Sequence, residues 1–247
     1  MRTRKKLLSK STLCVAAILA LVRSLLWPIP AFGHCAQPHP PICAEFFHRD
    51  AIFVGTVISS RHRSNGEDPG WFYALKVNRV FRGVLPPVAK VFTEQSSGQF
   101  PLKMHQSYLL FADSTKPDGL EIDNCGNSTE LVGASKEIHQ LEEVLSRAKA
   151  EEDGYVAGNV MRWDRGSNTP IERASITVRG KGRTYNAVTG KDGWFRVGLP
   201  VGKYVVTAKS SEWSIVPYDL SFDDPDDLVI HAGGCAAVEF GGVSRLR

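Results

Sequence analysis

Short runs of β-branched and aromatic residues recur through the first half of the chain. Four of these runs predict strands: Ala51 to Ser59, Trp71 to Phe81, Val88 to Thr93 and Tyr108 to Ala112. Turn-forming residues separate them, such as Asn65-Gly66 and Pro86-Pro87. Short strands spaced in this way indicate a closed barrel or a sandwich.

One segment has helical rather than strand periodicity. Between Ser135 and Ala150, apolar residues recur about every 3.6 positions, which predicts a helix with one buried stripe. The stripe consists of Ile138, Leu141, Val144 and Leu145. Ser135 is the expected N-cap. The acidic stretch Glu151 to Gly154 that follows is interpreted as a linker, and we place a domain boundary there.

The second half of the chain is again rich in strand patterns. Seven strands are predicted: Tyr155 to Trp163, Ala174 to Arg179, Arg183 to Val188, Trp194 to Val197, Lys203 to Ala208, Val229 to His231 and Ala237 to Phe240. Asp164 to Pro170 is expected to be a polar turn. Gly190 to Gly193 is expected to be a hairpin turn, because Asp192-Gly193 tolerates positive φ. Seven short strands in about 90 residues are typical of an immunoglobulin-like sandwich.

The beginning of the chain has the pattern of an export signal. Basic residues between Arg2 and Lys10 precede the apolar run Leu13 to Val22, and Ala31-Phe32-Gly33 is a small-x-small cleavage site. We therefore expect residues 1–33 to be a signal peptide and the mature protein to be secreted, periplasmic or in the cell envelope. An uncleaved membrane anchor is the alternative, because apolar residues continue past Arg23.

The formal net charge is +4, but the leader alone carries six basic and no acidic residues, so the rest of the chain is close to neutral. A nucleic-acid-binding protein needs clustered basic residues, so we expect no nucleic-acid partner. Contact with a membrane is expected only through an uncleaved leader.

The cysteines favour disulfide bonds. Removal of the leader leaves Cys35, Cys43, Cys125 and Cys235 of the five cysteines, an even number in an exported chain. None of them forms the paired short spacing of a metal site. Four cysteines allow three pairings, and the residues alone do not select one.

The sequence contains no catalytic signature. The metalloprotease H-E-x-x-H, the nucleophile elbow G-x-S-x-G, the phosphate-binding loop and the dinucleotide fingerprint are all missing. We therefore expect a protein that is not an enzyme and that has no catalytic residue, cofactor or metal.

Four weaker candidate sites were weighed against structural alternatives. His34 with His39 could bind Cu²⁺ or Zn²⁺, the alternative being a flexible terminus. The carboxylates of Asp223, Asp224, Asp226 and Asp227 suit Ca²⁺, but a solvated loop explains them as well.

The other two candidates concern carbohydrate. Trp163, Trp194 and Trp213 could form a platform that stacks on sugars, whereas a buried core position explains Trp194 and edge strands explain the other two. Asn127-Ser128-Thr129 matches the glycosylation sequon, and a turn after Cys125 is the preferred interpretation.

Motifs in the second half resemble a known family. They are Gly158-x-Val160, Pro170-Ile171-x-x-Ala174-x-Ile176-x-Val178, Thr189 to Phe195 and Leu199 to Tyr204. Residues 154–247 thus resemble a carboxypeptidase regulatory-like, or prealbumin-like, domain. The resemblance implies a folded accessory module without catalytic residues. Phe195 and Tyr204 are expected to be inward-facing anchors.

Motifs in the first half resemble the netrin-like OB-fold domain of tissue inhibitors of metalloproteinases. They are Cys35-Ala36-x-x-His39-Pro40-x-x-Cys43, Asp50 to Val57, and Leu120 to Cys125 before the helix. The resemblance implies an OB-like barrel with one helix over residues 34–150. It also implies that Cys35 pairs with Cys125, which leaves Cys43 either free or bonded to Cys235.

Those inhibitors begin with C-x-C, and the first cysteine chelates the zinc of the protease. Here Cys35 stands at the second of the two positions and Gly33 at the first, so the chelating cysteine is missing.

The expected protein is therefore mainly β: an OB-like barrel with one C-terminal helix, followed by a seven-stranded immunoglobulin-like sandwich. Its expected function is that of an exported accessory or binding protein, which presents loops to a protein or a surface polymer. Inhibition of a metalloprotease is the alternative function.

Overall fold

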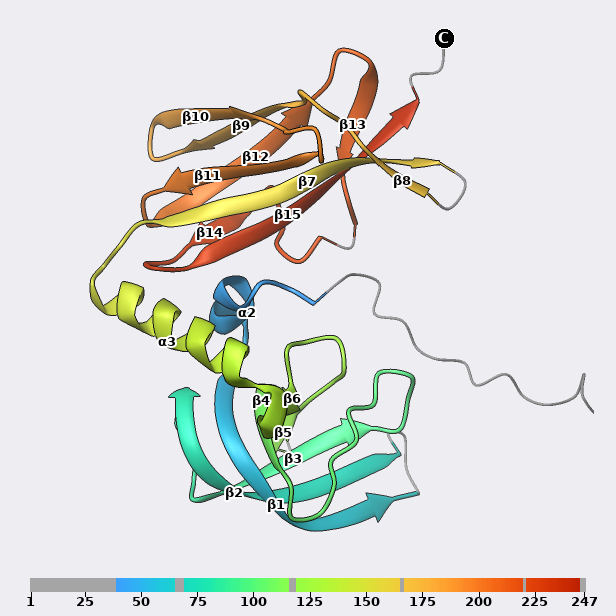
Figure 1. Ribbon diagram of the computed structural model, residues 1–247, viewed down its shortest axis with the longest axis vertical. Coiled ribbons are helices and arrows are strands. Elements are labelled where there is room, and N and C mark those ends of the chain that lie inside the picture. Colours follow the sequence, from blue (N-terminus) through green and yellow to red (C-terminus); the bar gives the residue numbers. More distant parts are fainter. Residues whose placement is uncertain (1–38, 65–68, 116–118, 165–166, 220, 245–247) are drawn as a thin grey trace, which may run out of the picture. The chain divides into compact units, whose positions relative to one another are not determined.

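The computed structural model describes residues 39–64, 69–115, 119–164, 167–219 and 221–244 (Figure 1). The protein is mainly β, which confirms the predicted fold class. Across these ranges, no helix has the length and apolar character needed to span a membrane. The predicted signal peptide, His34 and Cys35 lie outside the described residues. Residues His34–Arg247 group into one compact unit.

The strands of the first half form one sheet that closes on itself. They are β1 (Ala51–Arg63), β2 (Gly70–Arg82), β3 (Val88–Glu94), β4 (Ser107–Thr115), β5 (Gly119–Glu121) and β6 (Thr129–Glu130). The order is β1-β2-β3-β5-β4-β6, and β1 also pairs with β4 over Ala51–Thr56. Five strands therefore form a ring, in which β3 and β5 are parallel neighbours. Closure removes the free edges that an open sheet would expose.

Two strands of this ring are buried on both faces, which explains their continuous apolar sequences. Phe53 of β1 and Leu110 of β4 belong to the cluster inside the ring. Their neighbours Ile52 and Leu109 belong to a second cluster, shared with the helices α2 (Ile42–His48) and α3 (Ser135–Lys149). The helices thus cover the outer side of β1 and β4.

Helix α3 has the predicted extent and the predicted buried stripe, with Leu141 and Val144 in the core. The N-cap prediction is wrong, because Ser135 is the first helical residue and Ala134 is the N-cap. A 3₁₀ turn, Leu131–Gly133, leads directly into the helix, so the chain needs no side-chain cap to begin it. Helix α2 was not predicted, since seven residues are too few to establish a helical period.

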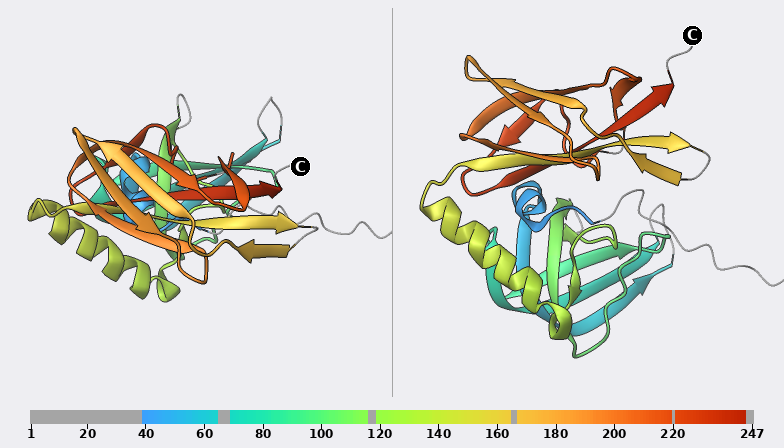
Figure 2. Two further views of the ribbon diagram at one scale, coloured as in Figure 1. Left: turned by 90° about the horizontal axis from the view of Figure 1, so that it is seen from above. Right: turned by 45° about the horizontal axis from the view of Figure 1, so that its top comes forward.

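The strands of the second half form a sandwich of two sheets (Figure 2). They are β7 (Gly154–Asp164), β8 (Ser167–Pro170), β9 (Ser175–Gly180), β10 (Arg183–Val188), β11 (Trp194–Leu199), β12 (Gly202–Lys209), β13 (Trp213–Pro217), β14 (Leu228–Ile230) and β15 (Cys235–Ser244). One sheet has the order β10-β9-β12-β14, and the other has the order β11-β7-β15-β13 with β8 paired to β7. Phe195 and Tyr204 lie in the core between the sheets, as predicted.

Two predictions for the sandwich need correction. It has nine described strands rather than seven: β8 lies within the predicted polar turn Asp164 to Pro170 and is exposed along its whole length, and the short strand β13 buries only Trp213 and Ile215, each in part. Gly190 to Gly193 is not a hairpin turn, since β10 and β11 belong to different sheets and the turn crosses between them. Gly193 does have the predicted positive φ, of 76°.

Candidate functional site

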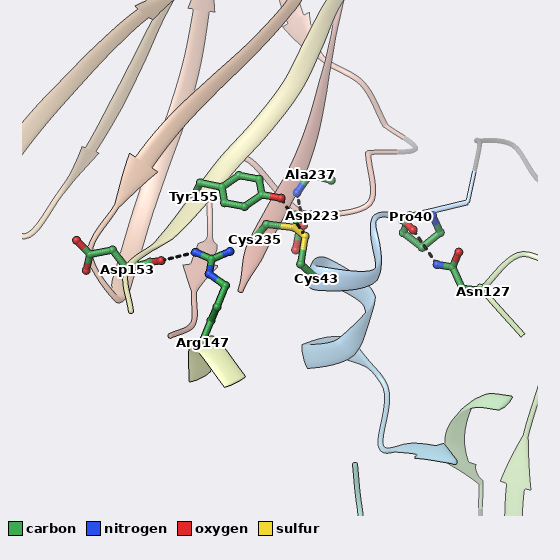
Figure 3. Close-up of a disulfide and its surroundings, with 9 residues drawn as sticks. All are labelled: Pro40, Cys43, Asn127, Arg147, Asp153, Tyr155, Asp223, Cys235 and Ala237. Atoms are coloured by element: carbon green, nitrogen blue, oxygen red, sulfur yellow. Dashed lines mark hydrogen bonds between the residues drawn. A yellow bond between two sulfur atoms is a disulfide. The ribbon is translucent and has the colours of Figure 1, made fainter. Parts of the chain in front are cut away.

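A disulfide bond joins helix α2 to the last strand of the sandwich (Figure 3). Cys43 is bonded to Cys235, with 5.2 Å between the Cα atoms and 192 residues between them in sequence. The hydroxyl of Tyr155 in β7 lies 3.2 Å from the Cys43 sulfur and can donate to it. Of the two alternatives left open for Cys43, the structure therefore has the bond to Cys235.

Cys125 is also disulfide-bonded. Its pairing with Cys35 remains a prediction, because Cys35 lies outside the described residues.

The same helix makes further contacts with the sandwich. The Phe47 ring stacks on His231, with 4.3 Å between ring centroids. Gly234 permits this approach, since an added Cβ would lie 2.5 Å from the Phe47 ring. His48 Nε2 donates to Asp223 Oδ1 at 2.6 Å. A covalent bond, a stacked pair and an ion pair thus hold α2 against the sandwich.

The other side of α2 is tied to the barrel by a buried carboxylate. Glu45 is completely buried, and its Oε1 accepts from Arg49 Nε at 2.8 Å. Its Oε2 accepts two bonds from Asn127, one from the backbone N–H at 3.0 Å and one from Nδ2 at 2.6 Å. Arg49 in turn donates to Asp113 of β4. The charge of Glu45 is therefore fully paired and hydrogen-bonded.

These contacts also decide the interpretation of the sequon. The Asn127 side-chain amide donates to the Pro40 carbonyl at 2.7 Å (Figure 3). It also donates to Glu45, and Ser128 is buried. The amide is thus engaged twice within the protein, which favours a structural role for Asn127. The structure therefore supports the interpretation of Asn127 as a turn residue.

The acidic segment is not simply a solvated loop. Asp223 is buried, and besides His48 it accepts the backbone N–H of Ala237 at 2.7 Å. Within the described ranges, no group of three His, Cys, Asp or Glu residues is placed to hold a metal ion. Of the proposed histidine pair, His39 is exposed and His34 lies outside the described residues.

The His48–Asp223 pair predicts a pH-dependent stability. The hydrogen bond to Asp223 raises the pKa of His48 above 6.5, and burial opposes it only in part. The folded state thus binds the proton more tightly than the unfolded state. The contribution of the pair is fully present below about pH 6.5 and is lost as the pH rises through the raised pKa. Urea unfolding of the protein and of His48→Gln, repeated at several pH values, measures it.

The expected result is a difference in unfolding free energy between the two proteins that is largest at low pH and shrinks as the pH rises. The pKa of His231 is lowered first by burial and also by His48 itself, so both proteins are compared in a His231→Gln background, which removes this second titration from the difference. A difference that stays constant from pH 5 to pH 9 would contradict the assignment.

Trp194 and Trp213 do not form one platform. Trp194 is 51% exposed on the outer face of its sheet, so its interpretation as a buried core residue is wrong. The alternation of β11 places its neighbour Phe195 in the core instead. Trp213 is half-buried at the start of the edge strand β13. The side chain of Trp163 lies outside the described residues.

Trp213 lies beside a polar cavity at one end of the sandwich. The cavity has a volume of about 610 Å³. Its lining residues come from the end of β7, from β8, from the turn before β9 and from the connection between β12 and β13: Arg162, Thr169, Pro170, Ile171, Glu172, Arg173, Ser210, Ser211, Glu212 and Trp213. The guanidinium of Arg162 lies 4.9 Å from the Trp213 ring centroid, in cation–π geometry.

Thr189 fixes one wall of this cavity. Its buried hydroxyl donates to the Ile171 carbonyl at 2.6 Å and accepts the Ala174 N–H at 2.9 Å. Its backbone bonds to Arg173 and Ala174, each at 3.0 Å. These bonds hold Arg173 in the left-handed region, with φ of 60°. Four hydrogen bonds from Thr189 therefore hold the turn, which lowers the cost of ordering it on binding.

A second cavity, of about 540 Å³, lies on the sandwich next to the same tryptophan. Val206, Ala208, Ile215 and Phe240 give it an apolar floor, and Lys209 and Asp226 are charged residues in its lining. Trp213 lines both cavities. Of the residues that line the two cavities, sequence analysis singled out only Trp213 and, as a possible Ca²⁺ ligand, Asp226, because the lining comes from segments that only the sandwich brings together.

Residues 156–230 match the family model of the carboxypeptidase regulatory-like domain. This part of the chain is a carboxypeptidase regulatory-like domain. The match confirms the resemblance inferred from the second-half motifs, and the whole lining of the polar cavity lies within this domain. The netrin-like resemblance of the first half remains a prediction.

No curated protein matches the sequence. Among solved structures, the chain is similar to BcpA, the major pilin subunit of Bacillus cereus, and to a variant of that subunit. Each is 8% identical with a TM-score of 0.26, and the matches cover 80% and 79% of this chain. The chain spans 60% and 59% of those pilin subunits.

Proposed function

We propose that this chain is an exported, non-catalytic binding protein that holds its partner at the end of the carboxypeptidase regulatory-like domain where Trp213 lies. The observation that carries the proposal is the cavity there, whose wall is fixed by Thr189. Preformed clefts that combine polar groups with an aromatic surface are the usual form of a ligand site. Loops carried on a rigid sandwich are a common place for one.

The disulfide bonds support export. Cys43, Cys125 and Cys235 are all disulfide-bonded, and such bonds form and persist in oxidising compartments outside the cytoplasm. This agrees with a signal peptide over residues 1–33 and with a secreted or envelope location.

Inhibition of a metalloprotease remains the alternative function. The closed ring of β1 to β5 fits the predicted OB-like barrel, which is the feature in its favour. The wedge of the inhibitors would lie at the mature N-terminus, which is outside the described residues.

Removal of the Trp213 ring tests the proposed site. The protein from His34 to Arg247 is incubated with cell-envelope fragments, which are pelleted, and the bound fraction is measured. We expect Trp213→Ala to reduce the bound fraction strongly. Trp194→Ala is the matched control, because it removes an equally large exposed ring outside both cavities, and it should bind like the unchanged protein. Equal retention of both variants, or no retention of the unchanged protein, would contradict the proposed function.

A further inference from the structure

We propose that the cavity beside Trp213 binds a polysaccharide, through pairs of neighbouring hydroxyl groups on its sugar rings. The inference rests on the proposed function, because it names the ligand of the same site. It draws on the chemistry of the lining, the position of the tryptophan and the conformation of Arg173.

The charges of the lining balance. Arg162 and Arg173 contribute two guanidinium groups, and Glu172 and Glu212 contribute two carboxylates. A phosphate or another anion would prefer an excess of cations, which this cavity lacks. Guanidinium and carboxylate are planar groups that make two parallel hydrogen bonds, so both suit a pair of adjacent hydroxyl groups. The hydroxyls of Thr169, Ser210 and Ser211 add further donors and acceptors.

The tryptophan supplies the apolar part of such a site. A sugar ring has an apolar face of C–H groups, which packs well against an aromatic ring. Because Trp213 lines both the polar cavity and the apolar one, a chain that occupies both would contact the same indole, beside the Arg162 guanidinium that lies over its ring. The ligand that fits this arrangement is a polymer rather than a single sugar.

The backbone of Arg173 positions its side chain in the cavity. A non-glycine residue with φ of 60° is strained, and glycine would adopt this conformation more easily. Thr189 holds the strained turn in place. The exposed Arg173 side chain therefore lines the cavity, where its guanidinium can reach a ligand.

Because Arg173 has a positive φ, a single variant at this position can separate an effect on binding from an effect on stability. Arg173→Gly removes the guanidinium but relieves the strain, so the melting temperature should be unchanged or higher. Its retention on envelope fragments should fall by about tenfold, the usual effect of losing a charged hydrogen-bond partner. Lys181→Gly is the matched control: Lys181 is also a basic residue with positive φ, of 50°, and it is absent from both cavity linings. It should bind like the unchanged protein.

The chemical class of the ligand is tested on the envelope fragments themselves. Periodate cleaves the carbon–carbon bond between adjacent hydroxyl groups and becomes reduced to iodate, so it destroys this feature in any polysaccharide that has it. We expect pretreatment of the fragments with periodate, followed by its removal, to abolish retention. Pretreatment with a protease should leave retention unchanged.

The outcomes separate the two proposals. Retention that resists periodate but is lost after protease treatment would show a protein partner, which overturns the polysaccharide inference and leaves the binding function standing. Retention by Arg173→Gly at the level of Lys181→Gly would also overturn the inference. If untreated fragments do not retain the unchanged protein, the binding function itself fails.

Discussion

Replacing Glu45 by alanine is expected to lower the free energy of unfolding by about 3–5 kcal/mol, the usual effect of removing one partner from a buried ionic network. The variant leaves the two Asn127 donors without their acceptor and removes the Arg49 Nε acceptor. It also opens space under Gly126, where an added Cβ would lie 2.3 Å from Glu45 Oε1. Urea unfolding followed by circular dichroism gives the free energy.

Glu130→Ala is the matched control for this experiment. Glu130 also forms an ion pair, with Lys103 at 3.2 Å, but both side chains are exposed. An exposed pair contributes about 0–1 kcal/mol, so the control should change stability little. If the two variants lose the same stability, then the buried network does not hold α2 to the barrel.

The contrast between these two glutamates shows what the sequence could not predict. Glu45 and Arg49 are spaced four residues apart, which on an exposed helix would indicate a weak surface pair. Their burial depends on Asp113 and Asn127, which are distant in sequence and reach α2 only when the barrel has closed. No local pattern contains that information.

Elements that bury a whole face were predictable. The strands of the barrel and the stripe of α3 follow from apolar periodicity, which is fixed by the strand and helix geometries themselves. The sandwich was recognisable because its turns require particular residues, such as Gly193 with its positive φ. The strands β8 and β13 were missed because they are short and bury little: β8 is exposed throughout, and β13 buries only Trp213 and Ile215 in part.

The cavity beside Trp213 could not be predicted from the sequence, because it also depends on residues that are distant in the chain. Its wall depends on the left-handed φ of Arg173, and an arginine gives no sign of that conformation. Thr189, which holds this wall in place, comes after β10 in the sequence, whereas the turn to which it bonds comes before β9. The only local signal was the aromatic Trp213, which the sequence could equally assign to an edge strand.

Removal of the Cys43–Cys235 bond is expected to lower the free energy of unfolding by about 4–5 kcal/mol. The bond spans 192 residues, and a cross-link over a long loop restricts the unfolded chain strongly. The double variant Cys43→Ala/Cys235→Ala tests this more cleanly than a reductant, because a reductant would also break the disulfide of Cys125.

The single variants show whether the loss comes from the cross-link. If it does, Cys43→Ala, Cys235→Ala and the double variant should lose nearly the same stability, because the bond is broken once in all three. If the two sulfurs acted only through packing, the losses of the single variants would add up in the double variant. Val243→Ala, an exposed change in the same strand β15, is the control and should stay within about 0.5 kcal/mol of the unchanged protein. A double variant as stable as this control would contradict a stabilising role for the disulfide.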